Sequence, residues 1–278
     1  MAKLSAFADE VTDDFRGQVE YLAAEKIGYI EPRFIDKKNI MDLTQNQLRE
    51  ARKMIREHGL KVSAIGSPIG KVKLDEPFGP HLDKFKHAID LAQFFQTLFI
   101  RMFSYYAPEG QNIDSFRNQV IDRMYAKITL LEGTDVVMVH ENEAHIYGHT
   151  AENCADIAKT VNSPKLRLAY DPANFVWGEK ITNNVDECWP VMKPYVVHVH
   201  IKDWKLGSKD IGSIPGQGDG QIKELLAELT AIDYQGCLTM EPHLQAGGQF
   251  GGSTGPELFS KAVAAVRKIA DEVGLQCD

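Results

Sequence analysis

The chain alternates short apolar runs with amphipathic helical segments along its whole length, and this order restricts the fold more than any other feature. Apolar runs of this kind, bounded by Gly, Pro, Asn or Asp, are typical of buried parallel strands. Strict alternation of strands and helices predicts a parallel α/β fold, and eight strands close a single (β/α)8 TIM barrel. We expect strands at 4–7, 29–33, 61–65, 98–101, 136–140, 166–170, 196–199 and 237–240, with helices at about 15–25, 44–59, 81–95, 113–131, 150–161, 185–192, 222–230 and 255–273.

An open doubly wound sheet also alternates strands and helices, and it is the alternative fold. Such a sheet usually carries a glycine-rich phosphate turn after its first strand. Here that segment is Ala8-Asp9-Glu10-Val11, which has no glycine. A barrel needs about 250 residues, and no low-complexity linker divides the chain. We therefore expect one barrel domain over residues 1–278.

Composition restricts the partners. The net charge is −8 and the isoelectric point is near 5.6, whereas nucleic-acid backbones and anionic membranes need a basic protein face. We expect neither as a partner. The N-terminus lacks the pattern of a signal peptide, and no apolar stretch approaches the roughly 20 residues of a spanning helix, so a cytoplasmic location is expected. The four cysteines show no C-x-x-C spacing, which disfavours a sulfur-ligated metal.

Each of the last four predicted strands ends at an acidic or imidazole side chain: Glu141, Asp171, His200 and Glu241. The C-terminal ends of the strands meet at one face of a barrel, so these side chains should converge. Three carboxylates gathered around one imidazole would repel one another unless a divalent cation held them. Oxygen-rich ligands with one nitrogen suit Mn²⁺, Mg²⁺ or Co²⁺ and also allow Zn²⁺. We take one Mn²⁺ ion as the first candidate.

Other polar side chains fall at the same predicted face. In the seventh strand, His198, His200 and Lys202 share one parity and should point into the barrel mouth. Lys202 and Arg101 are candidates for neutralising the site or orienting a substrate. Two roles are considered for His198: it supports a metal ligand, or it contacts a substrate.

Two further groups lie near strand ends. We expect Glu31 and Arg33 to form an ion pair at the barrel mouth rather than a pair that binds hydroxyl groups. Segment 215–220 is a glycine-rich turn, and it lacks the Lys and Ser/Thr of a phosphate-binding loop. Some of five aromatic residues are candidates for an apolar wall against which a sugar stacks: Phe103, Tyr105, Tyr106, Phe175 and Trp177.

The predicted centre suits proton transfer next to a carbonyl. A divalent cation that chelates a hydroxyl and the adjacent carbonyl stabilises an enediolate, which lowers the barrier to removing the α proton. One carboxylate can take the proton and a second can return one. This chemistry predicts a metal-dependent isomerase or epimerase that acts on a small carbohydrate. The alternative is a lyase or dehydratase on a keto-sugar, keto-inositol or 3-keto-glycoside, in which the enediolate expels a leaving group.

Five motifs carry these residues: His140-Glu141-Asn142, Tyr170-Asp171-Pro172-Ala173-Asn174-Phe175, His198-Val199-His200-Ile201-Lys202-Asp203, Gly216-x-Gly218-x-Gly220 and Met240-Glu241-Pro242. They resemble the sugar phosphate isomerase/epimerase family of xylose isomerase-like barrels, which includes ketose 3-epimerases, hydroxypyruvate isomerase and inosose dehydratase. The resemblance implies that Glu141, Asp171, His200 and Glu241 bind the metal and that Glu141 and Glu241 transfer the proton. It also implies a homo-oligomer, either a dimer or a tetramer.

The sequence departs from the ketose 3-epimerases at the substrate. Those enzymes carry a His three residues after the ligand Asp and an Arg downstream of the ligand His. Here the first position is Asn174, and the second is Lys202 or Lys205. Asn can donate to a hydroxyl but cannot carry a proton, so we expect the sugar to be held differently.

Two other classes are less favoured. An abasic-site endonuclease of the related barrel family needs a basic DNA face, which the negative net charge opposes. A sugar-binding barrel without catalysis is opposed by the presence of both Glu141 and Glu241.

Overall fold

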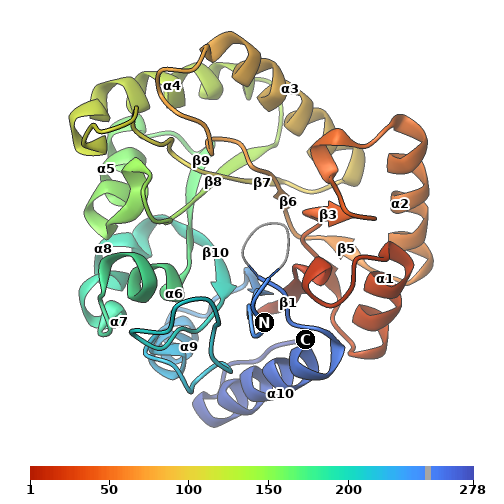
Figure 1. The fold of residues 1–278 in the computed structure, drawn as a ribbon. Helices are drawn as coiled ribbons and strands as arrows, with labels where there is room; N and C mark the ends of the chain where they lie inside the picture. The colour runs from red at the N-terminus through yellow and green to blue at the C-terminus, as the bar shows by residue number, and fades with distance from the viewer. Residues whose placement is uncertain (248–251) are drawn as a thin grey trace.

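The structure, a computed structural model, describes residues 1–247 and 252–278, whose strands form a barrel inside a ring of helices (Figure 1). The strands of this part are β1 (Lys3–Ala6), β2 (Tyr29–Ile30), β3 (Phe34–Ile35), β4 (Lys38–Asn39), β5 (Lys61–Val62), β6 (Ile65–Gly66), β7 (Phe99–Met102), β8 (Val137–Glu141), β9 (Leu166–Tyr170), β10 (Val196–Ile201) and β11 (Cys237–Met240).

Most of these strands form one parallel sheet in the order β1-β11-β10-β9-β8-β7-β6, with a separate parallel pair β2-β5. Backbone hydrogen bonds continue the barrel wall across the gap. Glu31 N donates to Ala6 O at 2.9 Å, and Ser63 N donates to Ile30 O at 2.9 Å. The wall therefore runs from β1 through β2 to β5 and β6, and the predicted (β/α)8 TIM barrel is confirmed.

Local sequence explains where several of the outer helices begin. Thr44 forms a capping box with Gln47, and the Asp14 side chain accepts a hydrogen bond from Gly17 N. The α-helices of the described chain are α1 (Phe15–Ala24), α2 (Gln45–Glu57), α3 (Phe78–Phe95), α4 (Arg117–Leu130), α5 (Ala151–Val161), α6 (Pro172–Asn174), α7 (Asn184–Glu187), α8 (Trp189–Met192), α9 (Ile222–Ala231) and α10 (Pro256–Val273).

Two predicted elements are divided in the structure. The strand expected at 61–65 is split into β5 and β6 around Ser63, whose carbonyl accepts a side-chain hydrogen bond from Thr97 Oγ1 at 2.8 Å. The helix expected at 185–192 is split into α7 and α8. Pro190 lies in the first turn of α8, where a residue without a backbone N–H starts a helix but cannot continue one.

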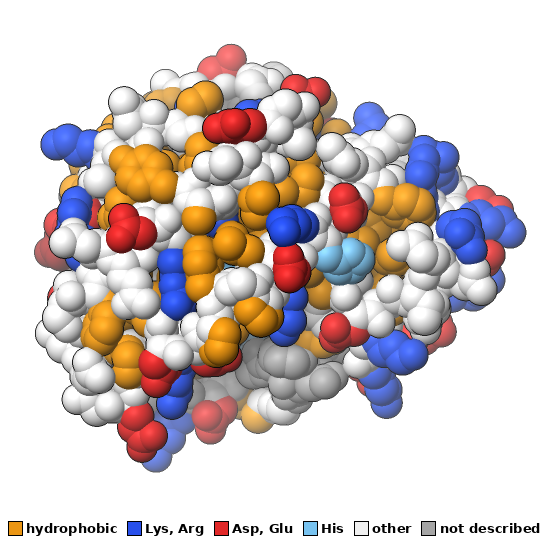
Figure 2. Space-filling view, turned by 90° about the horizontal axis from the view of Figure 1, so that it is seen from above, with side chains coloured by type: hydrophobic (Ala, Val, Ile, Leu, Met, Phe, Trp, Pro, Cys, Tyr) orange, Lys and Arg blue, Asp and Glu red, His pale blue; other side chains and the backbone are white. Residues whose placement is uncertain are grey.

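The surface carries mixed charge. On the face in Figure 2, basic, acidic and hydrophobic side chains are interspersed rather than gathered by type. This face does not offer the continuous basic surface that a nucleic-acid backbone requires. Among the described residues, the helices are too short or too polar to cross a membrane.

Candidate metal centre

The four strand-end side chains predicted as ligands meet at the C-terminal end of the barrel. Glu141 ends β8, Asp171 follows β9, His200 lies in β10 and Glu241 follows β11. One ligand atom from each lies within 4.8 Å of the others, and all four side chains are buried. The side chain of Asn142 ties two of these strand ends together, because it donates to Asp171 O and accepts from Asp171 N.

The geometry of His200 fits a cation ligand. Its Nδ1 lies 3.0 Å from Glu141 Oε1 and 3.5 Å from Glu241 Oε2. In the described part of the chain, neither ring nitrogen makes a hydrogen bond of acceptable geometry, although the ring is fully buried. A buried polar atom without a partner costs free energy. The three carboxylates and the imidazole therefore form a donor set that a divalent ion such as Mn²⁺, Mg²⁺, Co²⁺ or Zn²⁺ would satisfy.

Three basic side chains offset the charge of these carboxylates. Lys202 Nζ lies 2.8 Å from Asp171 Oδ2, and Arg101 Nε lies 3.6 Å from Glu141 Oε2. Arg33 Nη1 donates to Glu241 Oε1 at 2.8 Å. Each carboxylate thus has a basic partner on one side and faces the shared centre on the other.

This arrangement separates the pKa values of the carboxyl groups. Burial raises the pKa of Asp171 to about 7, although Lys202 acts in the opposite direction. Burial also opposes the ionisation of Glu141, but the nearby His200 outweighs it and lowers the pKa of Glu141 to about 2. Lys202 and other cations likewise outweigh burial at Glu241 and hold its pKa well below the usual range. Both directions favour the ionised carboxylate at Glu141 and Glu241, which is the form that binds a cation.

The predicted ion pair between Glu31 and Arg33 is wrong. Arg33 Nε donates to Asp9 at 2.9 Å, and its guanidinium lies 4.4 Å from the centre of the Phe7 ring while holding Glu241. Glu31 is fully buried inside the barrel, where other partners surround it. Sequence reasoning thus missed the contact of Arg33 with the site, and no local pattern indicates it.

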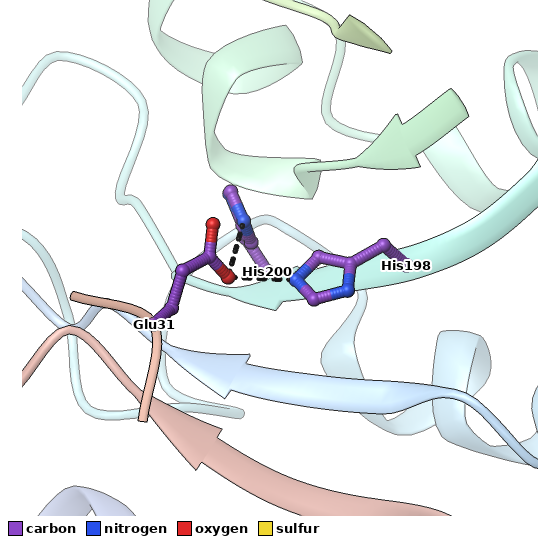
Figure 3. Close-up of side chains that lie close together, drawn as sticks. All are labelled: Glu31, His198 and His200. Carbon is purple, nitrogen blue, oxygen red and sulfur yellow. Dashed lines mark hydrogen bonds and ion pairs between the residues drawn. The ribbon is translucent and has the colours of Figure 1, made fainter. Parts of the chain in front are cut away.

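Glu31 approaches the Nε2 side of His200 (Figure 3), whereas Glu141 and Glu241 lie near its Nδ1. Its Oε2 is 2.7 Å from His198 Nε2 and 3.6 Å from His200 Nε2. Thr239 Oγ1 is 3.0 Å from both Glu31 Oε2 and His198 Nε2. The structure therefore places His198 in a buried contact with Glu31, two residues before His200 on the same face of β10, rather than among the residues that line the cavity.

A cavity of about 480 Å³ reaches the candidate metal centre, and two of the predicted ligands, Glu141 and Glu241, line it. Of the predicted substrate-binding residues, Arg101, Asn174 and Lys202 line it. Asn174 Nδ2 donates to Asn142 O at 2.9 Å and lies 3.3 Å from Glu141 Oε1. The Asn174 side chain therefore lies next to a predicted ligand rather than out in the solvent.

The aromatic residues predicted to form a wall fall into two groups. Phe103 and Trp177 line the cavity, whereas Tyr105 and Phe175 are buried in the core and Tyr106 is half-buried. Trp204, which the sequence did not single out, also lines the cavity.

The glycine-rich turn surrounds an acidic side chain of the chain itself. The amides of Gly216, Gly218 and Gly220 donate to the Asp203 carboxylate at 2.8–2.9 Å. A Cβ atom on Gly218 would lie 2.2 Å from Asp203 Oδ1, so a larger residue would not fit. The turn therefore binds Asp203 and holds the loop that carries Trp204.

Comparison with known proteins agrees with this fold. The sequence matches the family described as xylose isomerase-like TIM barrel over residues 19–274. The chain belongs to this family. No curated protein matches the sequence.

Solved structures show the same xylose isomerase-like fold at low sequence identity. The 3-keto-D-glucoside 4-epimerase YcjR from E. coli is 16% identical, with 96% of this chain and 98% of that chain covered and a TM-score of 0.72. D-psicose 3-epimerase from Clostridium cellulolyticum H10, solved with D-tagatose, is 14% identical, with 99% and 100% covered and a TM-score of 0.72. A xylose isomerase-like TIM barrel protein from Mycobacterium smegmatis, in complex with magnesium, is 14% identical, with 99% and 98% covered and a TM-score of 0.76.

Proposed function

We propose that this protein is a divalent-metal-dependent sugar epimerase or isomerase that removes a proton α to a carbonyl and passes through an enediolate. The observation that carries this proposal is the buried set Glu141, Asp171, His200 and Glu241, whose ligand atoms lie within 4.8 Å of one another. The sugar epimerases among the structures of similar fold, and the one solved with magnesium, support it. Mn²⁺ is the first candidate.

The site divides the work between its residues. A bound cation would polarise the substrate carbonyl and stabilise the charge that develops on its oxygen. Glu141 and Glu241 come from β8 and β11, which are separated in the sheet by β9 and β10. One carboxylate takes the α proton, and the other delivers a proton from the opposite side. The side chains of Arg101, Asn174 and Lys202 bind the oxygens of the sugar.

The test is exchange of the α proton in D₂O, followed by NMR. The protein is loaded with Mn²⁺, Mg²⁺, Co²⁺ or Zn²⁺ and incubated with ketoses, keto-inositols and 3-keto-glycosides. We expect exchange in the wild type and its loss in Glu141→Gln and Glu241→Gln, whereas Glu143→Gln, at the cavity rim, retains it. Absence of exchange with every substrate and metal would contradict the proposal. Growth of an enone-like ultraviolet absorbance would instead assign the lyase outcome.

Metal content separates ligands from other residues. We expect His200→Ala and Asp171→Ala to lower the metal content measured by elemental analysis. Full metal content in His200→Ala would show that the ligand assignment is wrong.

A further inference from the structure

Trp177 lies at the rim of the cavity with 37% of its surface exposed. Tryptophan side chains bury a large apolar area when they pack in a core, so an exposed one in a cavity wall is informative. Of the large exposed hydrophobic side chains in residues 1–247 and 252–278, Trp177 is the one that lines this cavity.

The loop after β8 packs against Trp177 and the residue that follows it. The His145 ring meets it edge-on, with 5.9 Å between the ring centres and an angle of 81° between the planes. The next residue, Gly178, packs so closely that a Cβ atom would lie 3.1 Å from Ala144 Cβ. The loop after β8 thus contacts the ring, and Lys180 Nζ lies 6.0 Å from the ring centre.

Trp177 is also placed at a defined position relative to the reacting centre. Asn174 ends α6, and Trp177 lies in the π-helix Phe175–Glu179 that follows it directly; both side chains line the cavity. Asn174 Nδ2 lies 3.3 Å from Glu141 Oε1. The ring of Trp177 and the Glu141 carboxylate therefore lie in the wall of the same cavity, with Asn174 contacting Glu141.

The outer part of the cavity is apolar on a second side. Trp204 lines it and packs against Ala173 and Val176. Its Nε1 is already bonded to Ser208 O at 3.1 Å, so the indole presents its carbon surface. Cavities of ~300–1,000 Å³ enclose drug-sized ligands, and this one measures about 480 Å³. One monosaccharide at the carboxylates would leave the tryptophan region filled by water.

From these observations, and on the basis of the proposed function, we propose that the substrate is a glycoside. Its keto-sugar ring binds at the carboxylates, and a second ring with an apolar face stacks on Trp177. An aryl group and the C–H face of a second sugar share this chemistry, and the free ketose lacks it.

The kinetic test compares 3-keto derivatives of methyl β-glucoside, phenyl β-glucoside and cellobiose in the α-proton exchange assay. We expect the wild type to have a lower KM for the two-ring substrates than for the methyl glycoside. Trp177→Ala should raise KM for a ring that stacks on it by about two- to tenfold and leave that of the methyl glycoside unchanged. The phenyl and cellobiose arms distinguish an aryl group from a second sugar. The matched control is Tyr125→Ala, an exposed aromatic on α4 away from the cavity.

Two outcomes would overturn the inference: equal KM values for methyl and two-ring substrates in the wild type, or an equal effect of Trp177→Ala on all three. Binding separates this failure from failure of the proposed function. Unreactive phenyl and methyl β-glucosides are titrated calorimetrically into Mn²⁺-loaded wild type and Trp177→Ala. A preference for the phenyl glycoside that is lost in the variant supports the subsite even if no exchange occurs, and equal affinities in the wild type refute an aryl subsite.

Discussion

Glu31 and His198 form a fully buried pair beneath the candidate metal centre, with 2.7 Å between Oε2 and Nε2. At this distance the two atoms share a hydrogen bond. The same Glu31 oxygen lies 3.6 Å from Nε2 of His200. Metal-binding histidines generally donate their second ring N–H to a carboxylate, which fixes the ring and its tautomer. We infer that Glu31 leaves Nδ1 of His200 available to the cation.

Replacing Glu31 with Gln should therefore weaken metal binding. The variant loses the negative charge that orients His200, and loss of such a partner generally lowers metal affinity about 10- to 100-fold. Competition with a fluorescent chelator measures the affinity. Glu143→Gln, at the cavity rim, is the control and should bind metal as the wild type does. Wild-type affinity in Glu31→Gln would show that Glu31 does not support the ligand.

Replacing Lys202 with Met should have the opposite effect on metal affinity. Lys202 Nζ lies 2.8 Å from Asp171 Oδ2 and 3.7 Å from Glu241 Oε2, so its charge opposes that of an incoming cation. Unit charges 4 Å apart interact by about 4 kcal/mol at an effective dielectric constant near 20, so a gain of roughly tenfold or more is expected. Lys205→Met, an exposed lysine paired with Asp219, serves as the control. A weaker metal complex in Lys202→Met would contradict this account.

Arg33 should affect turnover through the orientation of Glu241. Removing the 2.8 Å contact between them in Arg33→Gln frees the carboxylate, and a displacement of about 1 Å can lower a rate about 100-fold. We expect kcat for α-proton exchange to fall much more than KM rises, with partial recovery in Arg33→Lys. Lys71→Gln at the rim should not change kcat. If Arg33→Gln raised only KM, Arg33 would be a substrate contact.

His81 should make the fold sensitive to acid. It is buried on α3 and both ring nitrogens lack a partner among the described residues. Burial, together with Lys127 and Arg123, lowers its pKa from 6.5 to about 3. Below about pH 6.5 His81 is protonated in the unfolded chain, whereas in the folded chain it stays neutral until about pH 3. The free energy of unfolding therefore falls as the pH falls through this window.

In His81→Leu the loss of stability between about pH 7 and pH 5 should be smaller by roughly 2 kcal/mol. Urea denaturation at both pH values measures the free energy of unfolding. The control is His87→Leu, on the same helix but half-buried. An unchanged pH dependence in His81→Leu would exclude His81 as a source of acid sensitivity.

The sequence predicted the candidate ligands because each has a local signal. Glu141, Asp171, His200 and Glu241 all stand where an apolar run ends, and strand ends converge in a barrel whatever the loops do. The parity of His198 with His200 was also readable from alternation. The barrel itself follows from the same regularity.

The side chains that contact these residues could not be predicted from local sequence patterns. Arg33 and Glu241 are 208 positions apart, and Glu31 and His198 are 167 apart. Their contacts depend on which strands become neighbours in the barrel. The pairing of strands that are far apart in the chain cannot be read from a single sequence. The predicted pairing of Glu31 with Arg33 failed because it relied on closeness along the chain. A dimer or tetramer stays a prediction.

The pairing of β1 with β11, in which Lys3 lies opposite Cys237, has a consequence for biosynthesis. The ribosome makes β1 before the other barrel strands, but the neighbour of this strand, β11, and the adjacent Glu241 are made after all of them. A nascent chain therefore carries Glu141, Asp171 and His200 without their fourth companion. The complete candidate ligand set therefore forms only when β11 pairs with β1 and closes the barrel.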